Sequence, residues 1–313
     1  MSSHPKELLF IQGVKKTGTS TIVGILNCHP EIFVLYETML NNSMVSKYGN
    51  QILSRYPEAR QFFRTNKDFG VSYLEFLSFL EKKNPSFRYR YFGDKIISID
   101  PDKICTKCEY KIIFALRDIR TWLIKEQIRG DYRTDLDLVP AALDYLYYCI
   151  GSVRRPNSIR VRLEDLVKHN QDEVNRVARF LNVDLSVYTD HWWEKLDVFH
   201  EEDPKSSIRW YDGHQSSRIK PTEMDSSVLL KPNPFWDTIL YLFDKYYYCE
   251  DKSDFEEGEI QHDIDSLEEY RKFSPVRLED AYFNISTTRL GVDRPQSWKQ
   301  KFKGKIQKFW GDV

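Results

Sequence analysis

Short apolar segments alternate with segments of helical periodicity, and this alternation restricts the fold more than any other feature of the sequence. Strands are predicted at residues 8–11, 32–35, 91–97, 111–116 and 159–162. Helical patterns lie between them, notably at residues 19–27, 140–150 and 171–181. Strands separated by helices form a parallel sheet that is covered on both faces. We therefore predict a three-layer α/β fold whose ligand site lies at the carboxyl ends of the strands.

Composition and charge exclude several classes of protein. The chain has 313 residues, of which 41% are hydrophobic, so it has ample material for a core. Its 46 basic and 47 acidic side chains give a net charge of -1, which argues against a protein that coats nucleic acid. Residues 1–7 are polar, and no apolar stretch reaches the ~20 residues of a spanning helix. We therefore expect a cytoplasmic protein.

The cysteines indicate neither a disulfide framework nor a metal site. There are five of them, an odd number, which agrees with a reducing compartment. Cys105 and Cys108 form one C-x-x-C pair, but no second pair or histidine lies at the spacing of a zinc site. We interpret this pair as a chance one in a loop and predict no metal.

The character of the sequence changes near residue 250. Residues 250–269 carry ten acidic side chains and one lysine, which is typical of a solvated segment. Residues 298–310 repeat Trp, Phe and Ile at helical spacing among five lysines. Such a helix either packs on its own domain or lies on an anionic membrane, so a peripheral membrane contact stays open. We predict an α/β domain over residues 1–250 and an extension over residues 251–313.

A loop suited to an anion lies between the first predicted strand and the first predicted helix. Residues 13–20 read G-V-K-K-T-G-T-S, with two glycines five residues apart followed by two hydroxyl residues. Backbone amides and the helix dipole favour an anion at such a turn, as in P-loop folds. In an NTPase a lysine follows the second glycine, but Thr19 occupies that position here, and the lysines lie earlier, at Lys15 and Lys16. The loop therefore favours an anion other than magnesium-bound triphosphate.

This variant loop resembles the phosphosulfate-binding loop of sulfotransferases that use 3′-phosphoadenosine 5′-phosphosulfate (PAPS). Later segments support the resemblance in the same order as in that family: F-G-D-K at residues 92–95, L-R-D-I-R at 116–120, V-R-L-E-D-L at 161–166 and V-A-R-F-L-N-V at 177–183. The first of these is typical of carbohydrate-directed members. The resemblance spans about residues 8–185 and implies PAPS as the donor, 3′-phosphoadenosine 5′-phosphate (PAP) as the product, and no metal.

The resemblance also implies which residues bind the donor. Lys16 matches the loop lysine that neutralises the leaving phosphate. The other loop residues implied to hold the 5′-phosphosulfate are Lys15, Thr17, Gly18, Thr19 and Ser20. Arg117 matches the arginine that holds the 3′-phosphate. Lys125 stands where the family usually has a serine, so it is either a second ligand of that phosphate or a sign that the site is rearranged.

The acceptor hydroxyl needs a base, and the resemblance implies Glu37. It follows H-P-E-I-F at residues 29–33, as a catalytic glutamate does in many carbohydrate-directed relatives. Asp94 and Lys95 are implied to face the acceptor or the sulfuryl group, or else form a surface pair. The expected acceptor is therefore a hydroxyl of a carbohydrate or a glycolipid.

Two other classes of function remain open. A P-loop small-molecule kinase or NTPase would explain the loop, but not the position of its lysines or the later segments. A non-catalytic nucleotide-binding module would keep the fold without turnover. Binding of magnesium-ATP but not of PAP would indicate the first class, and binding of PAP without sulfate transfer would indicate the second.

Overall fold

The structure, a computed structural model, describes residues 6–38, 47–65, 68–85, 88–96, 105–128, 135–185, 234–249 and 254–267. The chain divides into two compact units. The first comprises Met1–Arg117 and Pro156–Thr222, and the second comprises Asp118–Arg155 and Glu223–Val313. The boundary that we predicted at residue 250 falls inside the second unit.

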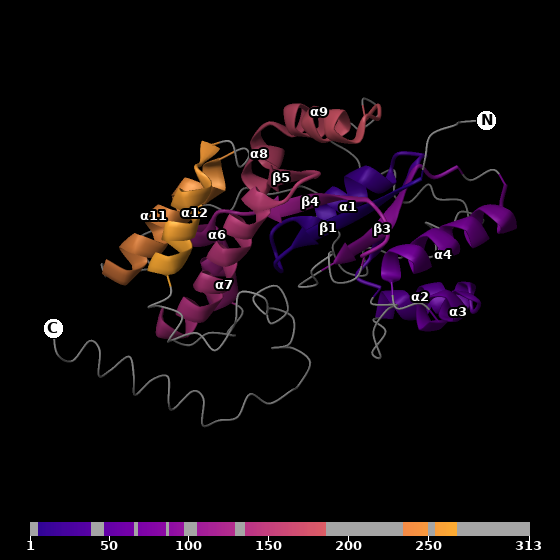
Figure 1. Cartoon of the computed structure of the whole chain (residues 1–313), viewed down its shortest axis with the longest axis horizontal. Helices are drawn as coiled ribbons and strands as arrows, with labels where there is room; N and C mark the ends of the chain where they lie inside the picture. The colour runs from indigo at the N-terminus through magenta and orange to yellow at the C-terminus, as the bar shows by residue number, and fades with distance from the viewer. Residues whose placement is uncertain are drawn as a thin grey trace, which may run out of the picture. The chain divides into compact units, whose positions relative to one another are not determined.

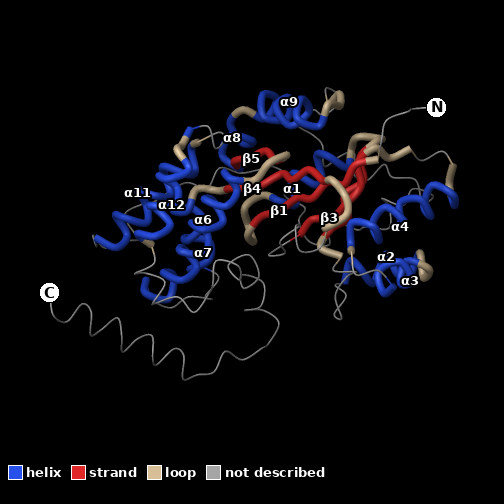
Figure 2. Tube along the Cα trace, in the orientation of Figure 1, coloured by secondary structure: helices blue, strands red, loops and turns tan. Residues whose placement is uncertain are grey.

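The first unit is built on a parallel sheet of five strands (Figures 1 and 2). The strands are β1 (Glu7–Gly13), β2 (Ile32–Tyr36), β3 (Tyr91–Ile96), β4 (Tyr110–Leu116) and β5 (Ser158–Arg162). Their order is β2-β3-β1-β4-β5, and every neighbouring pair is parallel. This confirms the predicted α/β class, and each strand begins and ends within two residues of its predicted position.

The helices of the first unit lie on the sheet or pack on a neighbouring helix. They are α1 (Thr19–Asn27), α2 (Lys47–Arg55), α3 (Ala59–Thr65), α4 (Phe69–Lys83), α8 (Leu163–Lys168) and α9 (Asn170–Leu181). Between β1 and β2 the chain moves outward along the sheet through α1, and between β2 and β3 it returns through α4. Parallel crossovers are right-handed, so this reversal of direction places α1 and α4 on opposite faces.

The strands are apolar along most of their length because both faces of the sheet are covered. Residues 8–11 of β1 and residues 32–35 of β2 are fully buried. Gly93 in β3 is required by a close approach of two strands, since a Cβ there would lie 1.9 Å from the carbonyl oxygen of Leu9. The core thus fixes the positions at which the strands end, and the residues that follow those ends are held on a rigid scaffold.

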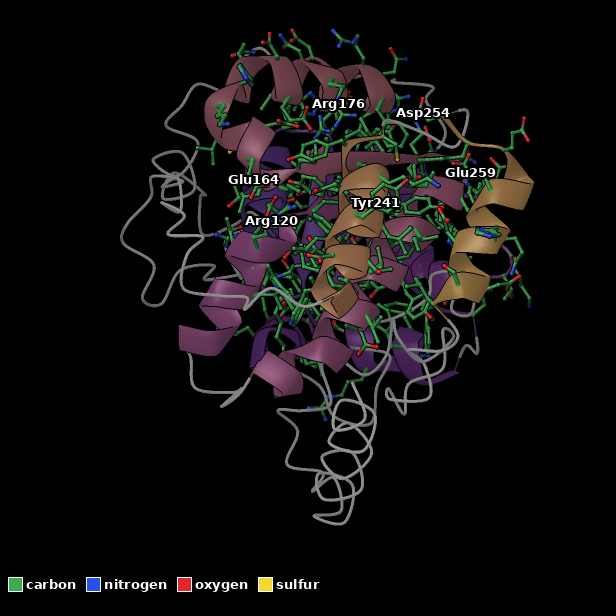
Figure 3. The ribbon with its side chains drawn as sticks, turned by 90° about the vertical axis from the view of Figure 1, so that its left-hand side faces the viewer. Arg120, Glu164, Arg176, Tyr241, Asp254 and Glu259 are labelled. Carbon is green, nitrogen blue, oxygen red and sulfur yellow. The ribbon has the colours of Figure 1, made fainter. Side chains whose placement is uncertain are left out.

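The second unit is helical. It contains α6 (Ile119–Ile128), α7 (Asp135–Arg154), α11 (Pro234–Tyr248) and α12 (Glu257–Ser266). Tyr145 of α7 packs against Trp122 of α6 and Phe243 of α11, with ring centroids 5.0 and 5.7 Å away. Figure 3 shows the side chains here, with Tyr241 on α11 and Glu259 on α12.

The acidic segment near residue 260 is not solvated throughout. Ile260, Ile264 and Leu267 recur at i, i+4 and i+7 and form a buried stripe on and just after α12. The buried Asp263 accepts hydrogen bonds from Lys245 and Tyr246 of α11. The count of acidic residues concealed this apolar stripe, which is why the sequence suggested a solvated segment.

Two further sequence predictions concern contact with a membrane. Among the described helices, none combines the length and the apolar character needed to cross a membrane. The predicted basic amphipathic helix at residues 298–310 lies outside the described residues.

Candidate active site

The predicted site residues of the first unit meet at the carboxyl edge of the sheet. The loop of residues 14–18 follows β1, Glu37 follows β2, and Arg117 follows β4. Asp94 and Lys95 lie near the end of β3, where Leu35 pairs with Asp94 and Tyr36 with Lys95. Ligands of parallel sheets bind at this edge. The candidate residues named from the sequence therefore lie at the edge of the sheet where the alternation of strands and helices placed them, and their roles stay predictions.

The loop after β1 has the conformation of an anion-binding turn. Gly18 is the N-cap of α1 and has a φ angle of +93°, which favours glycine. Lys16 also has a positive φ, of 69°, and its side chain is exposed. Because a helix begins directly after Gly18, the amide groups of its first turn have no partner within the helix and point toward the loop. These amides and the Lys16 ammonium group together suit a phosphate or sulfate ester.

Two of the predicted donor ligands in the loop are buried. The buried hydroxyl of Thr17 donates to the carbonyl oxygen of Val14 at 2.8 Å. Thr19 is buried as well, 3% exposed. The Thr17 hydroxyl therefore holds the turn together, and neither threonine side chain is exposed as a donor.

Arg117 braces the loop from the neighbouring strand. Its side chain is buried, and Nη1 donates to the carbonyl oxygen of Lys16 at 3.1 Å. This bond ties the end of β4 to the residue of positive φ in the loop. A contact of Arg117 with a 3′-phosphate stays a prediction. Lys125 lies on α6 in the second unit, and its side chain lies outside the described residues.

Lys95 joins the loop helix to Glu37. Its Nζ lies 2.6 Å from Oε1 of Glu37 and 3.2 Å from Oγ of Ser20. It also lies 4.2 Å from the centre of the Tyr36 ring, and the Tyr36 hydroxyl hydrogen-bonds Ser20. The Lys95 side chain is 4% exposed, whereas that of Glu37 is 31% exposed. The pair therefore presents a carboxylate to solvent beside the anion-binding turn and keeps the ammonium group beneath it.

Asp94 faces the interior instead of a substrate. It is 2% exposed and accepts hydrogen bonds from the Thr38 amide at 3.2 Å, from the Thr38 hydroxyl, and from the Tyr73 hydroxyl at 3.1 Å. Burial raises the pKa of Asp94 to about 7, although these hydrogen bonds act in the opposite direction. The predicted contact of Asp94 with the acceptor or the sulfuryl group is not supported by this position, because the surrounding side chains enclose the carboxylate.

The sequence did not identify Tyr36, Thr38 and Tyr73 as parts of this site. Tyr36 and Thr38 flank Glu37 at the end of a predicted strand, so their place at the carboxyl edge could have been predicted from the sequence. Tyr73 lies on α4, far from the site in the sequence, and no local pattern distinguishes it from the other aromatic residues of that helix.

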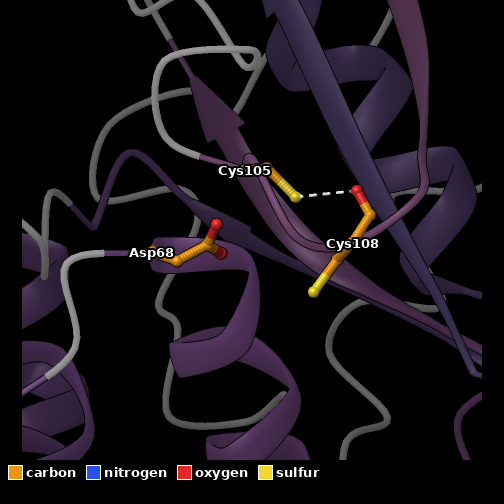
Figure 4. Close-up of side chains that lie close together, drawn as sticks. All are labelled: Asp68, Cys105 and Cys108. Atoms are coloured by element: carbon orange, nitrogen blue, oxygen red, sulfur yellow. Dashed lines mark hydrogen bonds between the residues drawn. The ribbon is translucent and has the colours of Figure 1, made fainter.

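A second cluster lies between the start of α4 and the loop that precedes β4. Figure 4 shows Asp68, Cys105 and Cys108, whose potential ligand atoms lie within 4.8 Å of one another. Asp68 is the N-cap of α4 and accepts from the Val71 amide at 3.1 Å. Its other oxygen accepts from the Thr106 amide and hydroxyl, both at 2.7 Å, and from the Lys107 amide at 2.9 Å. The carboxylate thus joins a helix cap to a loop.

The two thiols of this cluster are poorly suited to a metal. Burial raises the pKa of Cys105 to about 12, and burial also raises the pKa of Cys108. A thiol binds metal as its thiolate, which such surroundings disfavour. The Cys105 thiol instead donates to the carbonyl oxygen of Cys108 at 3.3 Å. We interpret the cluster as a structural junction.

Comparison with known proteins yields structural likenesses alone. No protein-family model matches the sequence, and no curated protein matches it by sequence. The sulfotransferase domain of the Synechococcus PCC 7002 olefin synthase is similar in structure, with a TM-score of 0.46 and 15% identity over 79% of this chain and 96% of that domain. Sulfotransferase STF9 from Mycobacterium avium has a TM-score of 0.39 and 12% identity over 77% of this chain and 76% of its own. A retinol dehydratase in complex with retinol and PAP has a TM-score of 0.37 and 13% identity over 87% of this chain and 83% of its own.

Proposed function

We propose that this protein is a PAPS-dependent sulfotransferase that moves a sulfuryl group to an acceptor hydroxyl. The observation that carries the proposal is the link through Lys95, which places the Glu37 carboxylate beside Ser20 at the start of α1. A base and an anion-binding turn then share one edge of the sheet. Sulfotransfer needs both, one for the acceptor proton and one for the leaving phosphate.

The residues of the turn fit a phosphosulfate. The amides at the start of α1, the exposed Lys16 and the hydroxyl of Ser20 are all hydrogen-bond donors within or directly after the loop. A transferring sulfuryl group carries less negative charge than a phosphoryl group, so amides and a lysine can replace the metal clamp of phosphoryl transfer. We assign the contacts with the 5′-phosphosulfate to residues 15–20 and a contact with the 3′-phosphate to Arg117.

The proposed reaction is a single displacement. Glu37 accepts the proton of the acceptor hydroxyl, and the hydroxyl oxygen forms a bond to sulfur while the bond from sulfur to the bridging phosphate oxygen breaks. The electron pair of the broken bond stays on that oxygen, where Lys16 stabilises the negative charge. PAP leaves, and the acceptor leaves as a sulfate ester.

We further propose that the acceptor is a hydroxyl of a carbohydrate or a glycolipid. The support for this is the carboxylate base and its surroundings: Glu37 is partly exposed, and the polar groups of Lys95 and Ser20 lie next to it. Such a site suits a polar, hydrated acceptor better than a purely apolar one.

The test is transfer of radiolabelled sulfate from PAPS to a panel of glycans, glycolipids and phenols. We expect transfer to a sugar hydroxyl, and we expect both Lys16→Ala and Glu37→Gln to abolish it. Glu37→Gln should still bind PAP, since the turn that holds the donor is unchanged. Undiminished transfer in both variants would contradict the assignment, and transfer to phenols alone would contradict the proposed acceptor.

A further inference from the structure

Two consecutive residues of β3 hold Glu37 from opposite faces of the sheet. Successive side chains of a strand point to opposite faces. Lys95 points toward α1, where it meets Ser20, and binds the carboxylate of Glu37. Asp94 points toward α4, where it meets Tyr73, and binds the residue that follows Glu37 in the chain.

The bonds to Thr38 fix a backbone conformation that is uncommon for glutamate. Glu37 has a φ of 46°, in the left-handed region that residues other than glycine seldom occupy. Such a residue persists when its surroundings leave it no alternative. Strand pairing holds Tyr36 on one side of Glu37, and Asp94 holds both the amide and the hydroxyl of Thr38 on the other. Thr38 is fully buried, so the residue that follows Glu37 is anchored in the interior.

We propose that Asp94 is a positioning residue that acts through Thr38 to hold the backbone of Glu37, so that the Glu37 carboxylate meets Lys95 and faces the anion-binding turn. The inference rests on the proposed function, because it gives Glu37 the role of the base. It assigns Asp94 no contact with either substrate. Positioning of this kind has a large effect on rate, because a displacement of about 1 Å in a reacting group costs about 100-fold.

The decisive variant is Thr38→Val, which keeps the shape of the side chain and removes the hydroxyl that Asp94 binds. We expect kcat to fall by about 10- to 100-fold. The Kd for PAP, measured by calorimetry, should change by less than about twofold, because the donor turn lies on another strand and keeps its amides. Thr38→Ser restores the hydroxyl and should recover most of the lost kcat.

A matched control is available in the other cluster. Thr106→Val also removes a threonine hydroxyl that an aspartate binds, but Thr106 lies in the loop before β4, away from the carboxyl edge. It should lower stability without lowering kcat. Tyr73→Phe removes a single hydrogen bond to Asp94 and should lower kcat in the same direction as Thr38→Val, by a smaller factor.

A readout without sulfate transfer separates this inference from the proposed function. In the native protein Lys95 is 4% exposed and paired with Glu37, so its acetylation by acetic anhydride, followed by mass spectrometry, should be slow. Thr38→Val should accelerate it and Thr38→Ser should not. If the wild type transfers no sulfate to any acceptor of the panel but Thr38→Val still accelerates the acetylation of Lys95, the positioning role is supported and the proposed function is overturned. Normal kcat with unchanged acetylation in Thr38→Val would overturn the positioning role alone.

Discussion

Asp94 and Asp68 are two carboxylates of the first unit that bind threonine in the same way and behave in opposite ways. Each accepts hydrogen bonds from the amide and the hydroxyl of one threonine, Thr38 for Asp94 and Thr106 for Asp68. Burial raises the pKa of Asp94 to about 7. Burial acts in the same direction on Asp68, but the hydrogen bonds from Thr106, Val71 and Lys107 outweigh it and lower the pKa.

The difference lies in the depth of burial, which is greater for Asp94, and in the number of backbone donors. Asp68 accepts from one amide at the start of α4 and from two amides and one hydroxyl of the loop before β4. Asp94 accepts from one amide and two hydroxyls inside the core. Amides at a helix start also carry the positive end of the helix dipole. A similar bond to threonine can therefore belong to a stable helix cap, as at Asp68, or to a carboxylate whose ionised form is held at an energetic cost, as at Asp94. Costly arrangements of this kind tend to gather at functional sites.

The largest expected effect is on catalysis. Asp94→Asn replaces one carboxylate oxygen by an amide nitrogen, which cannot accept the hydrogen bonds that Thr38 and Tyr73 donate to Asp94, so the Thr38 anchor should loosen and kcat should fall by about 100-fold. Asp68→Asn disturbs the other cluster in a similar way and should leave kcat within about twofold, because the base and the donor turn do not depend on it. Steady-state sulfate transfer measures both variants. Equal losses of kcat would remove the functional distinction between the two carboxylates.

The pH dependence of stability should have opposite signs at the two sites. The folded-state pKa of Asp94 is raised from 3.8 to about 7. The stability that its protonation contributes is therefore fully present below pH 3.8 and is lost as the pH rises toward about 7. The free energy of unfolding of the wild type relative to Asp94→Asn should therefore decrease across this range, by at most about 1.4 kcal/mol per pH unit.

For Asp68 the folded-state pKa is lowered. The stability that its ionised form contributes is therefore present above pH 3.8 and is lost as the pH falls through the folded-state pKa. Urea unfolding of the wild type and of the two asparagine variants between about pH 3 and about pH 8, a range that includes the ordinary pKa of aspartate and the raised pKa of Asp94, measures both differences. Other acidic groups cancel in each difference. A wild-type advantage over Asp94→Asn that grows with pH would show that Asp94 is ionised without cost.

The strands were predictable, and so was the placement of the candidate residues at the strand ends, because each depends on local sequence. Buried parallel strands are apolar runs, so β1 to β5 were found, and the turn and Glu37 follow two of those runs directly. The inward role of Asp94 was not predictable, since Asp94 and Lys95 are adjacent polar residues. The packing of α4 decides which of them faces the core, through Tyr73. That contact joins residues 21 positions apart and leaves no local pattern.

The next effect in size is on stability. Asp68→Ala removes the cap of α4 and the acceptor for Thr106 and Lys107. The loss of an N-cap costs about 1 kcal/mol, and unpaired donors nearby add to it, so we expect about 2 kcal/mol in the free energy of unfolding. Denaturant unfolding at neutral pH measures this. Thr106→Val should cost less, about 1 kcal/mol, because the amides keep their acceptor. A loss in Asp68→Ala no larger than that in Thr106→Val would mean that the cap contributes little.

The smallest effect expected is that of zinc on the cluster of Asp68, Cys105 and Cys108. Zinc would need thiolates, while burial raises the pKa of Cys105 to about 12, and it would compete with four donors for the oxygens of Asp68. Equimolar zinc should therefore leave the Tm unchanged at neutral pH, as it should in a Cys108→Ser control. A rise in Tm for the wild type alone would show that the ion can displace these donors. Asp68 would then be a ligand held ready by its cap, and the contrast with Asp94 would lie between two functional carboxylates rather than between a stable cap and a site residue.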